Sequence, residues 1–241
     1  MPVTWEERGW QRLGGRAGRC RLPVWDCTAG LVVGADGILL VDAGSSLAEG
    51  ARLRDAAHAL TGRRVTHLAL THPHFDHVFG AAAFPGAEVF AAADGDGVSG
   101  PADAAALRAD AVANGLAPAA AAEAAAAPVA PARPVTGELA LDLGGGVRAL
   151  LVNAGPGHTG HDLAVRVEGD PAVVFCGDLV EESGEPQAGP DAVPGRWPAA
   201  LDRLLALGGP DALYVPGHGA VVDAAFARAQ RDVLATRFGV S

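Results

Sequence analysis

The sequence predicts an α/β fold in which mixed β-sheets are covered by helices. Short apolar runs separated by glycine come first, alternating helical and apolar segments follow, and two hairpin-like segments precede a final helix–strand–helix unit. This order is typical of sheets with helices packed against them. No stretch rich in proline, serine or charge divides the 241 residues, and layered α/β folds often reach this length as one unit. We therefore expect a single domain over residues 1–241.

The first half of the chain is predicted to contain five strands and one helix. Apolar runs bounded by glycine or turn residues indicate the strands, and the first three are close enough in sequence to form a meander. Residues 46–60 have leucine and alanine at helical spacing, and Ser45 or Ser46 is a suitable N-cap. The predicted strands are residues 18–25, 30–34, 37–44, 65–72 and 86–93.

The second half is predicted to hold an alanine-rich helical region, two hairpins and a helix–strand–helix unit. Residues 101–127 are rich in alanine with few helix breakers, so they are expected to form one or two helices. Turn residues Glu168 to Pro171 lie in the middle of the second hairpin. The hairpins span residues 138–158 and 162–180, and the last unit has a helix at 196–209, a strand at 212–219 and a helix at 221–238.

The charge balance argues against several classes of partner. The chain has 18 lysine and arginine residues against 28 aspartate and glutamate residues, a formal net charge of −10. This charge has the wrong sign for attraction to nucleic-acid phosphates or anionic membranes. No apolar run reaches the roughly 18 residues that span a membrane, and the N-terminus does not resemble a secretory signal. We expect a cytoplasmic protein that acts on a small-molecule substrate, and the sequence leaves its oligomeric state open.

The three cysteines, Cys20, Cys27 and Cys176, are an odd and sparse set that does not indicate a disulfide framework. None of them belongs to a CxxC pair. We interpret all three as ordinary small buried residues.

The stretch THPHFDHVFG concentrates three of the eight histidines of the chain. Pro73 disfavours a helical conformation at the residue before it, so the stretch is expected to begin extended. Alternate residues of an extended chain point the same way, which places His72, His74 and Asp76 on one side, and His77 follows as the chain turns. Imidazole nitrogens and a carboxylate that converge at a strand end form a ligand set suited to zinc or iron.

Three further potential ligands lie beside glycine at the expected ends of apolar strands. They are His158 in NAGPGHTGHD, Asp178 in VVFCGDLV and His218 in YVPGHG. Glycine lets the backbone turn sharply and approach a bound group closely. Each residue alone is weak evidence, but together with the histidine-rich stretch they indicate one site assembled from several strand ends.

These motifs, in this order, resemble those of the metallo-β-lactamase superfamily. The resemblance begins at Asp42 in VDAG, continues through the HxHxDH block and GPGHTGH, and ends with CGD and PGHG, so it covers residues 42–218. It implies an α/β fold of the four-layer αββα sandwich type, with a metal centre at one edge of the two sheets.

The resemblance also implies a role for each motif residue. One metal would be held by three histidines and the other by an aspartate and two histidines, with a second aspartate bridging both. Asp42 would support the ligand loops, since carboxylates commonly orient metal-bound histidines. His161 would have a supporting or structural role, because the ligand set is complete without it. The first set is His72, His74 and His158, the second is Asp76, His77 and His218, and the bridge is Asp178.

The implied activity is metal-dependent hydrolysis of an ester, thioester or related carbonyl compound. Two zinc ions, or iron or manganese in their place, would lie about 3.5–4 Å apart and share a hydroxide that forms at neutral pH. Asp76 would orient this hydroxide and could carry a proton to the leaving group. The sequence does not identify the residues that bind the substrate.

Several activities share this ligand set. Asp178 resembles the thioesterase branch, which includes the hydroxyacylglutathione hydrolases, whereas zinc β-lactamases usually have cysteine or serine there. Those thioesterases hold glutathione with a C-terminal helical region, but only one helix is expected after His218. Lactonases often use a tyrosine near the metals, and the only tyrosine is Tyr214, on the last predicted strand. The same motifs are also compatible with a mononuclear iron enzyme of the persulfide dioxygenase type and with a non-catalytic metal-binding module.

Overall fold

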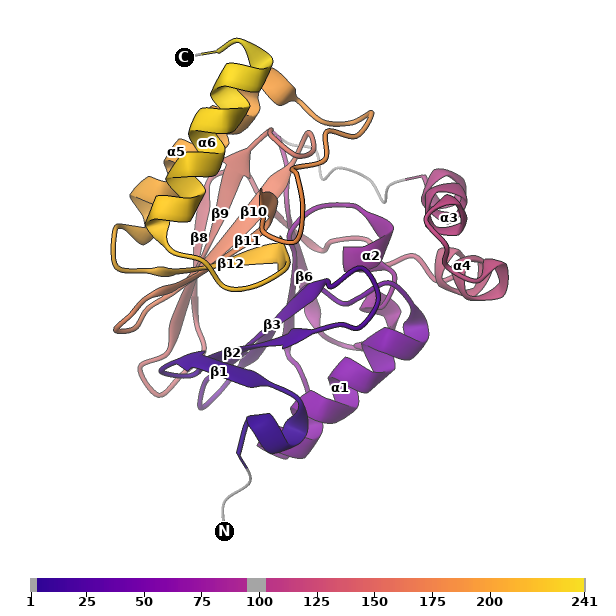
Figure 1. Cartoon of the computed structure of the whole chain (residues 1–241). Helices are drawn as coiled ribbons and strands as arrows, with labels where there is room; N and C mark the ends of the chain where they lie inside the picture. Colours follow the sequence, from indigo (N-terminus) through magenta and orange to yellow (C-terminus); the bar gives the residue numbers. More distant parts are fainter. Residues whose placement is uncertain (1–3, 95–102, 241) are drawn as a thin grey trace.

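Two β-sheets pack face to face, and helices cover the outer surface of each sheet (Figure 1). The computed structural model describes residues 4–94 and 103–240. The two sheets and their helices form the four layers αββα that the sequence motifs imply. No helix within these two ranges is long and apolar enough to cross a membrane.

The larger sheet has seven strands in the order in which they occur along the chain. Its first four strands form an antiparallel meander, as the glycine-separated apolar runs predict. The last four strands are parallel to one another, so their carboxyl ends meet at one edge of the sheet. The strands are β1 (Gln11–Gly14), β2 (Ala17–Arg21), β3 (Thr28–Val33), β4 (Ile38–Val41), β5 (His67–Leu70), β6 (Glu88–Ala92) and β7 (Arg133–Val135).

The smaller sheet has five strands in the order β12-β11-β10-β9-β8. The two predicted hairpins are present as the antiparallel pairs β8–β9 and β10–β11. The last strand is parallel to β11, because a helix crosses between them. The strands are β8 (Glu138–Asp142), β9 (Arg148–Gly155), β10 (Asp162–Val167), β11 (Val173–Glu181) and β12 (Leu213–His218).

The helices are α1 (Leu47–Thr61), α2 (Phe75–Val78), α3 (Ala104–Ala113), α4 (Pro118–Ala125), α5 (Trp197–Gly208) and α6 (Ala224–Phe238), with short 3-10 turns at Glu6–Arg8, Ala81–Ala83 and Pro194–Arg196. α1 packs on the larger sheet through Leu53, and α5 and α6 pack on the smaller sheet through Leu204 and Leu234. Between the sheets, Leu39 of β4 and Leu151 of β9 belong to one fully buried apolar cluster. The α5–α6 pair and α1 therefore lie on opposite sides of the molecule (Figure 1).

Local signals explain most element boundaries. Ser46 accepts a hydrogen bond from the backbone N–H of Glu49 and is the N-cap of α1, and Gly62 ends that helix with a φ of 68°. The alanine-rich region forms α3 and α4, while its first two residues, 101 and 102, lie outside the described ranges. The sequence does not predict β1 and β7, because these edge strands are only four and three residues long and too short for a recognisable pattern.

Candidate metal centre

The histidine-rich stretch leaves the end of β5 and turns into the short helix α2. The backbone is extended at His74, which has a φ of −84° and a ψ of 150°, and it becomes helical at Phe75. The prediction that the extended conformation reaches Asp76 is therefore wrong. The backbone oxygen of His74 already accepts a hydrogen bond from the N–H of His77, and this turn directs the Asp76 and His77 side chains.

The structure brings all seven residues expected as metal ligands together, and adds one more. They form two groups of histidine, aspartate and cysteine side chains in which the ligand atoms lie within 4.8 Å of one another. A third, overlapping group adds Glu181 to Asp178 and His218. The first group is His72, His74, His158 and Asp178, and the second is Cys27, Asp76, His77 and His218.

The first group has the dimensions of a metal site. Nε2 of His158 lies 3.0 Å from Nδ1 of His74. Oδ2 of Asp178 lies 3.4 Å from Nε2 of His158 and 3.6 Å from Nε2 of His72. Two nitrogens that each lie about 2.0–2.1 Å from a tetrahedral zinc ion are about 3.3 Å apart. The spacing of these atoms is therefore close to that of ligands around one ion.

The second group is equally compact. Nε2 of His77 and Nε2 of His218 are 3.4 Å apart. Oδ2 of Asp76 lies 3.3 Å from the His218 nitrogen and 3.7 Å from the His77 nitrogen. Cys27, from the turn between β2 and β3, places its Sγ 3.2 Å from the same Asp76 oxygen.

The Asp178 carboxylate lies between the two groups. Its Oδ2 is 3.3 Å from Nε2 of His218, and its Oδ1 is 3.3 Å from Nε2 of His77. The prediction that Asp178 stands at a strand end is wrong, because β11 continues to Glu181. Instead the pairing of β11 with β12 shifts register at Gly177, which has a φ of 54°, and this bulge presents the carboxylate to the histidines.

Because Gly217 has no side chain, the Asp178 carboxylate can lie against its backbone. A Cβ atom on Gly217 would overlap Oδ1 of Asp178. A Cβ on Gly177 would lie 2.8 Å from the Thr71 side chain, and its left-handed backbone also favours glycine. The glycines beside Asp178 and His218 therefore allow the close approach that the sequence indicated.

Each cluster histidine has its other ring nitrogen hydrogen-bonded to a fixed partner. For His158 and His218 this partner is a backbone carbonyl oxygen, which only accepts, so Nδ1 carries a proton and Nε2 is the nitrogen that faces the group. Such outer partners fix the tautomer that a metal ion requires. The pairs are His72 Nδ1 with Thr71 Oγ1 at 2.9 Å, His74 Nε2 with Asp191 at 3.1 Å, His77 Nδ1 with Asp42 at 2.9 Å, His158 Nδ1 with the Gln187 oxygen at 3.1 Å and His218 Nδ1 with the Trp25 oxygen at 2.6 Å.

Asp42 connects the end of β4 to the histidine-rich stretch. Its carboxylate accepts hydrogen bonds from the backbone N–H and the hydroxyl of Thr71, both at 2.8 Å, and from Nδ1 of His77 at 2.9 Å. Its φ of 61° is uncommon for a residue other than glycine, and such strained residues cluster at functional sites. This is the arrangement expected of a carboxylate that supports the ligand loop.

The charges in the two groups favour a bound cation. Burial opposes protonation of His77 and His218, yet the Asp178 carboxylate holds the pKa of both imidazoles well above the usual value for histidine. Burial likewise opposes ionisation of Asp76, but the charge of His77 lowers its pKa to about 2. Burial lowers the pKa of His158 to about 4, which leaves its imidazole neutral. A bound cation would replace the protons that these carboxylates draw to His77 and His218, since metal binding displaces protons from its ligands, and His158 is already neutral.

Two buried atoms point into the groups without a hydrogen-bond partner. They are Nε2 of His72 and Oδ1 of Asp178, which have none among residues 4–94 and 103–240. Buried polar atoms are nearly always satisfied in folded proteins, by protein, water or an ion. A metal ion would satisfy both atoms, and the donor set of imidazoles and carboxylates suits zinc. The residues present therefore fit a metal centre.

Several supporting residues could not be found from the sequence. Asp191 lies 117 positions beyond His74, so no local spacing connects the two. Cys27 is buried, as expected, but interpreting it as an ordinary buried residue misses its place in the second group. His161 belongs to neither metal-ligand group, and its Nδ1 lies 3.7 Å from the Asp94 carboxylate.

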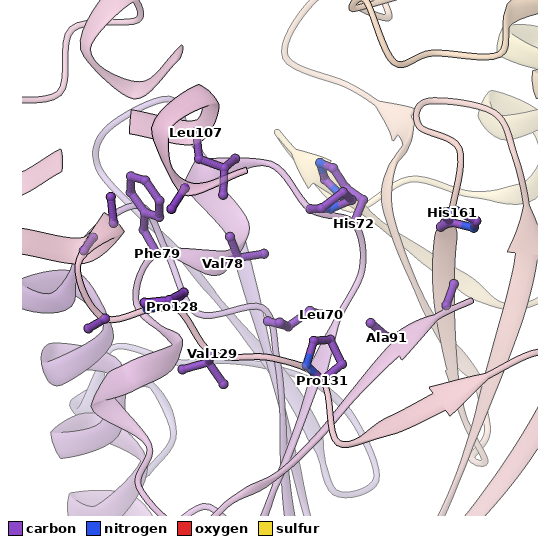
Figure 2. Close-up of a pocket in the computed structure, with 16 residues that line it drawn as sticks. Leu70, His72, Val78, Phe79, Ala91, Leu107, Pro128, Val129, Pro131 and His161 are labelled. Atoms are coloured by element: carbon purple, nitrogen blue, oxygen red, sulfur yellow. The ribbon is translucent and has the colours of Figure 1, made fainter. Parts of the chain in front are cut away.

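An apolar pocket of about 80 Å³ adjoins the first group. Figure 2 shows Val78, Phe79 and Leu107 on one side of it and His72 and His161 on the other. Alanines of α3 and α4 complete the wall. The volume is about half that of a cavity that holds benzene, so the pocket suits a small apolar group.

An αββα sandwich with paired histidine and aspartate groups at one sheet edge defines the class of the protein, a metal-binding α/β sandwich. A sequence profile described as "Metallo-beta-lactamase superfamily" matches residues 22–218. The chain therefore belongs to the metallo-β-lactamase superfamily, whose members are largely metal-dependent hydrolases. No significant match is found among curated protein sequences.

Solved structures of similar fold include several metallo-β-lactamases. A metallo-beta-lactamase from Pontibacter korlensis is 18% identical, with a TM-score of 0.69 over 93% of this chain and 97% of that one. The metallo-beta-lactamase FIM-1 from Pseudomonas aeruginosa, in a mono-zinc form, is also 18% identical, with a TM-score of 0.66 over 98% of this chain and 96% of that one. At this identity the likeness establishes the shared fold alone.

Proposed function

We propose that the protein is a hydrolase with two metal ions, with zinc as the metal, that cleaves an ester, a thioester or a related carbonyl substrate. The observation that carries this proposal is the placement of the Asp178 carboxylate between two groups of ligand atoms. The oriented histidine tautomers around it support the same conclusion.

His72, His74 and His158 would hold one metal, and the second group would hold the other, with Asp178 shared. When bound, the two cations would polarise the substrate carbonyl and lower the pKa of a water molecule towards about 7. Asp76 is ionised at neutral pH, because its pKa is about 2, so its carboxylate can accept a hydrogen bond and orient that water. The same carboxylate could take a proton from that water and pass it to the leaving group.

Two features of the chain narrow the range of substrates. Tyr214 donates its hydroxyl hydrogen bond to the Gly209 carbonyl at 2.9 Å and is buried, so it is not free to assist a lactone substrate. Asp178 replaces the cysteine or serine that is usual in zinc β-lactamases. These observations favour a simple ester or thioester.

The pocket beside His72 suits the acyl side of such a substrate. Its lining residues are apolar apart from two histidines. About 80 Å³ accommodates a few methylene groups, so short acyl chains fit better than long ones. We therefore expect acetyl to butyryl esters or thioesters to be cleaved faster than long-chain ones.

The experiment combines metal analysis with a substrate panel. The purified protein is loaded with zinc and tested on aryl esters and acyl thioesters of increasing chain length, a lactone and a chromogenic β-lactam. We expect turnover of short acyl substrates that disappears after chelation, returns with zinc and is absent in His74→Ala. Absence of turnover on every ester and thioester would refute the proposal. Iron retention together with sulfide-dependent oxygen uptake would instead establish a persulfide dioxygenase.

A further inference from the structure

The turn between β2 and β3 delivers a thiol into the second metal-ligand group. Cys27 is 2% exposed, and its backbone forms an isolated bridge with His218. The turn is fixed by hydrogen bonds from the Leu22 N–H to the Cys27 oxygen at 2.7 Å and from the Gly219 N–H to the Asp26 oxygen at 3.3 Å. The position of Sγ is therefore determined by the same backbone that holds His218.

Cys27 and three residues of the second group form a tetrahedron of ligand atoms. Sγ lies 3.2 Å from Oδ2 of Asp76, 3.9 Å from Nε2 of His77 and 3.8 Å from Nε2 of His218. The other three edges are 3.3, 3.4 and 3.7 Å. In a tetrahedral zinc site, with Zn–S of about 2.3 Å and Zn–N or Zn–O of about 2.0–2.1 Å, the edges are about 3.3–3.6 Å. All six observed edges lie within about 0.4 Å of that range.

An independent observation points to a ligand at this place. Oδ1 of Asp178, which faces His77, is buried without a hydrogen-bond partner among the described residues. Nδ1 of both His77 and His218 is occupied by an outer partner, so their Nε2 atoms face Sγ and would be the atoms that bind a metal ion in place of a proton. The four atoms thus have donor chemistry, orientation and spacing suited to one metal ion.

We propose that Cys27 is a thiolate ligand of the second metal, forming with Asp76, His77 and His218 a sulfur-containing site that selects zinc over manganese. This inference rests on the proposed two-metal function. Binding releases the thiol proton to solvent and needs no oxidant or reductant, since only the S–H bond breaks and an S–metal bond forms. Thiolate is a soft ligand that favours zinc, whereas manganese prefers oxygen.

The test is the absorption spectrum of the cobalt(II)-loaded protein. A cobalt–thiolate bond produces a near-ultraviolet charge-transfer band, which imidazole and carboxylate ligands do not produce. We expect this band in the wild-type protein, its loss in Cys27→Ser, and its retention in Cys176→Ala. Cys176 is the matched control because it is a free thiol of similar burial, 1% exposed, that packs in the apolar cluster under α5 and α6.

Metal affinity gives a second measurement. Competition with a zinc chelator should show that Cys27→Ser weakens one of the two zinc equivalents by at least about tenfold and leaves the other unchanged. The preference of that equivalent for zinc over manganese should fall in the same variant.

The outcomes separate this inference from the function on which it rests. If wild-type protein binds two cobalt ions without the charge-transfer band, Cys27 only donates a hydrogen bond to Asp76, and the inference fails while the two-metal function stands. If no cobalt binds, both fail. A band that survives Cys27→Ser would also overturn the inference.

Discussion

Replacing Asp42 with asparagine tests how strongly the outer carboxylate supports the metal centre. The carboxylate accepts three hydrogen bonds, two from Thr71 and one from His77. Asparagine retains the shape and tolerates the φ of 61°, so the backbone need not change. Its NH₂ group, however, must face at least one N–H or O–H donor, which removes a charge-assisted hydrogen bond and leaves a buried donor unpaired. Such losses cost about 1.5–3 kcal/mol each.

We therefore expect Asp42→Asn to lower the free energy of unfolding of the metal-free protein by about 2–3 kcal/mol. The affinity for the metal held by His77 should fall about 10–100-fold, because outer carboxylates fix the ligand tautomer. Urea unfolding and chelator competition measure the two effects. The matched control is Asp55→Asn, whose side chain is 70% exposed and which should change neither quantity. Unchanged metal affinity in Asp42→Asn would refute the reasoning.

Three further predictions concern the bulge, a buried carboxyl and the pocket. Gly217→Ala should displace the Asp178 carboxylate, because the new Cβ would overlap it, and the protein should lose bound metal. Burial raises the pKa of Asp162 from 3.8 to about 7, so the folded state binds this proton more tightly than the unfolded state. The free energy of unfolding of the wild-type protein should therefore fall by up to about 4 kcal/mol as pH rises from about 4 to 7. Asp162→Asn should lack this decline in urea unfolding. Ala125→Leu should fill part of the pocket and raise KM for short acyl substrates about tenfold, equivalent to lost burial of roughly two methylene groups.

Each of these predictions has a control or a contradicting result. Gly137→Ala is the control for the bulge, because a Cβ there meets nothing within 4 Å, and full metal content in the Gly217 variant would contradict the argument. If the free energy of unfolding depended on pH equally in wild type and Asp162→Asn, burial would not raise the pKa of the Asp162 carboxyl. Ala126→Leu, an exposed position next to Ala125, should leave KM unchanged, and an equal effect of both leucines would exclude the pocket as the acyl site.

Features with a local signal in the sequence were predictable. The N-cap of α1 at Ser46, the two hairpins and the meander follow from capping residues, turns and apolar runs. The seven expected ligands converge because each belongs to a motif at or near the end of an apolar segment. The superfamily resemblance, now supported by a profile match over residues 22–218, supplied the layer order.

Features that depend on tertiary contacts were not predictable in the same way. Asp178 owes its direction to a bulge at Gly177, which strand alternation cannot reveal. Asp76 is directed by a helical turn that begins one residue after His74. Cys27 contacts Asp76 although 49 positions separate them in the sequence, and the residues around Cys27 do not form a recognisable metal-ligand motif. The bulge arises from the pairing of β11 with β12, and Cys27 and Asp76 come from different loops of the larger sheet, so neither feature follows from neighbouring residues.

The number of metal ions per chain tests the central claim most directly. Zinc-saturated protein, freed of unbound metal, is analysed by elemental mass spectrometry together with His158→Ala and His218→Ala. These variants each remove one ligand from a different group. We predict two zinc ions per wild-type chain and about one in each variant. At most one metal ion per wild-type chain, whichever metal is supplied, would contradict the account.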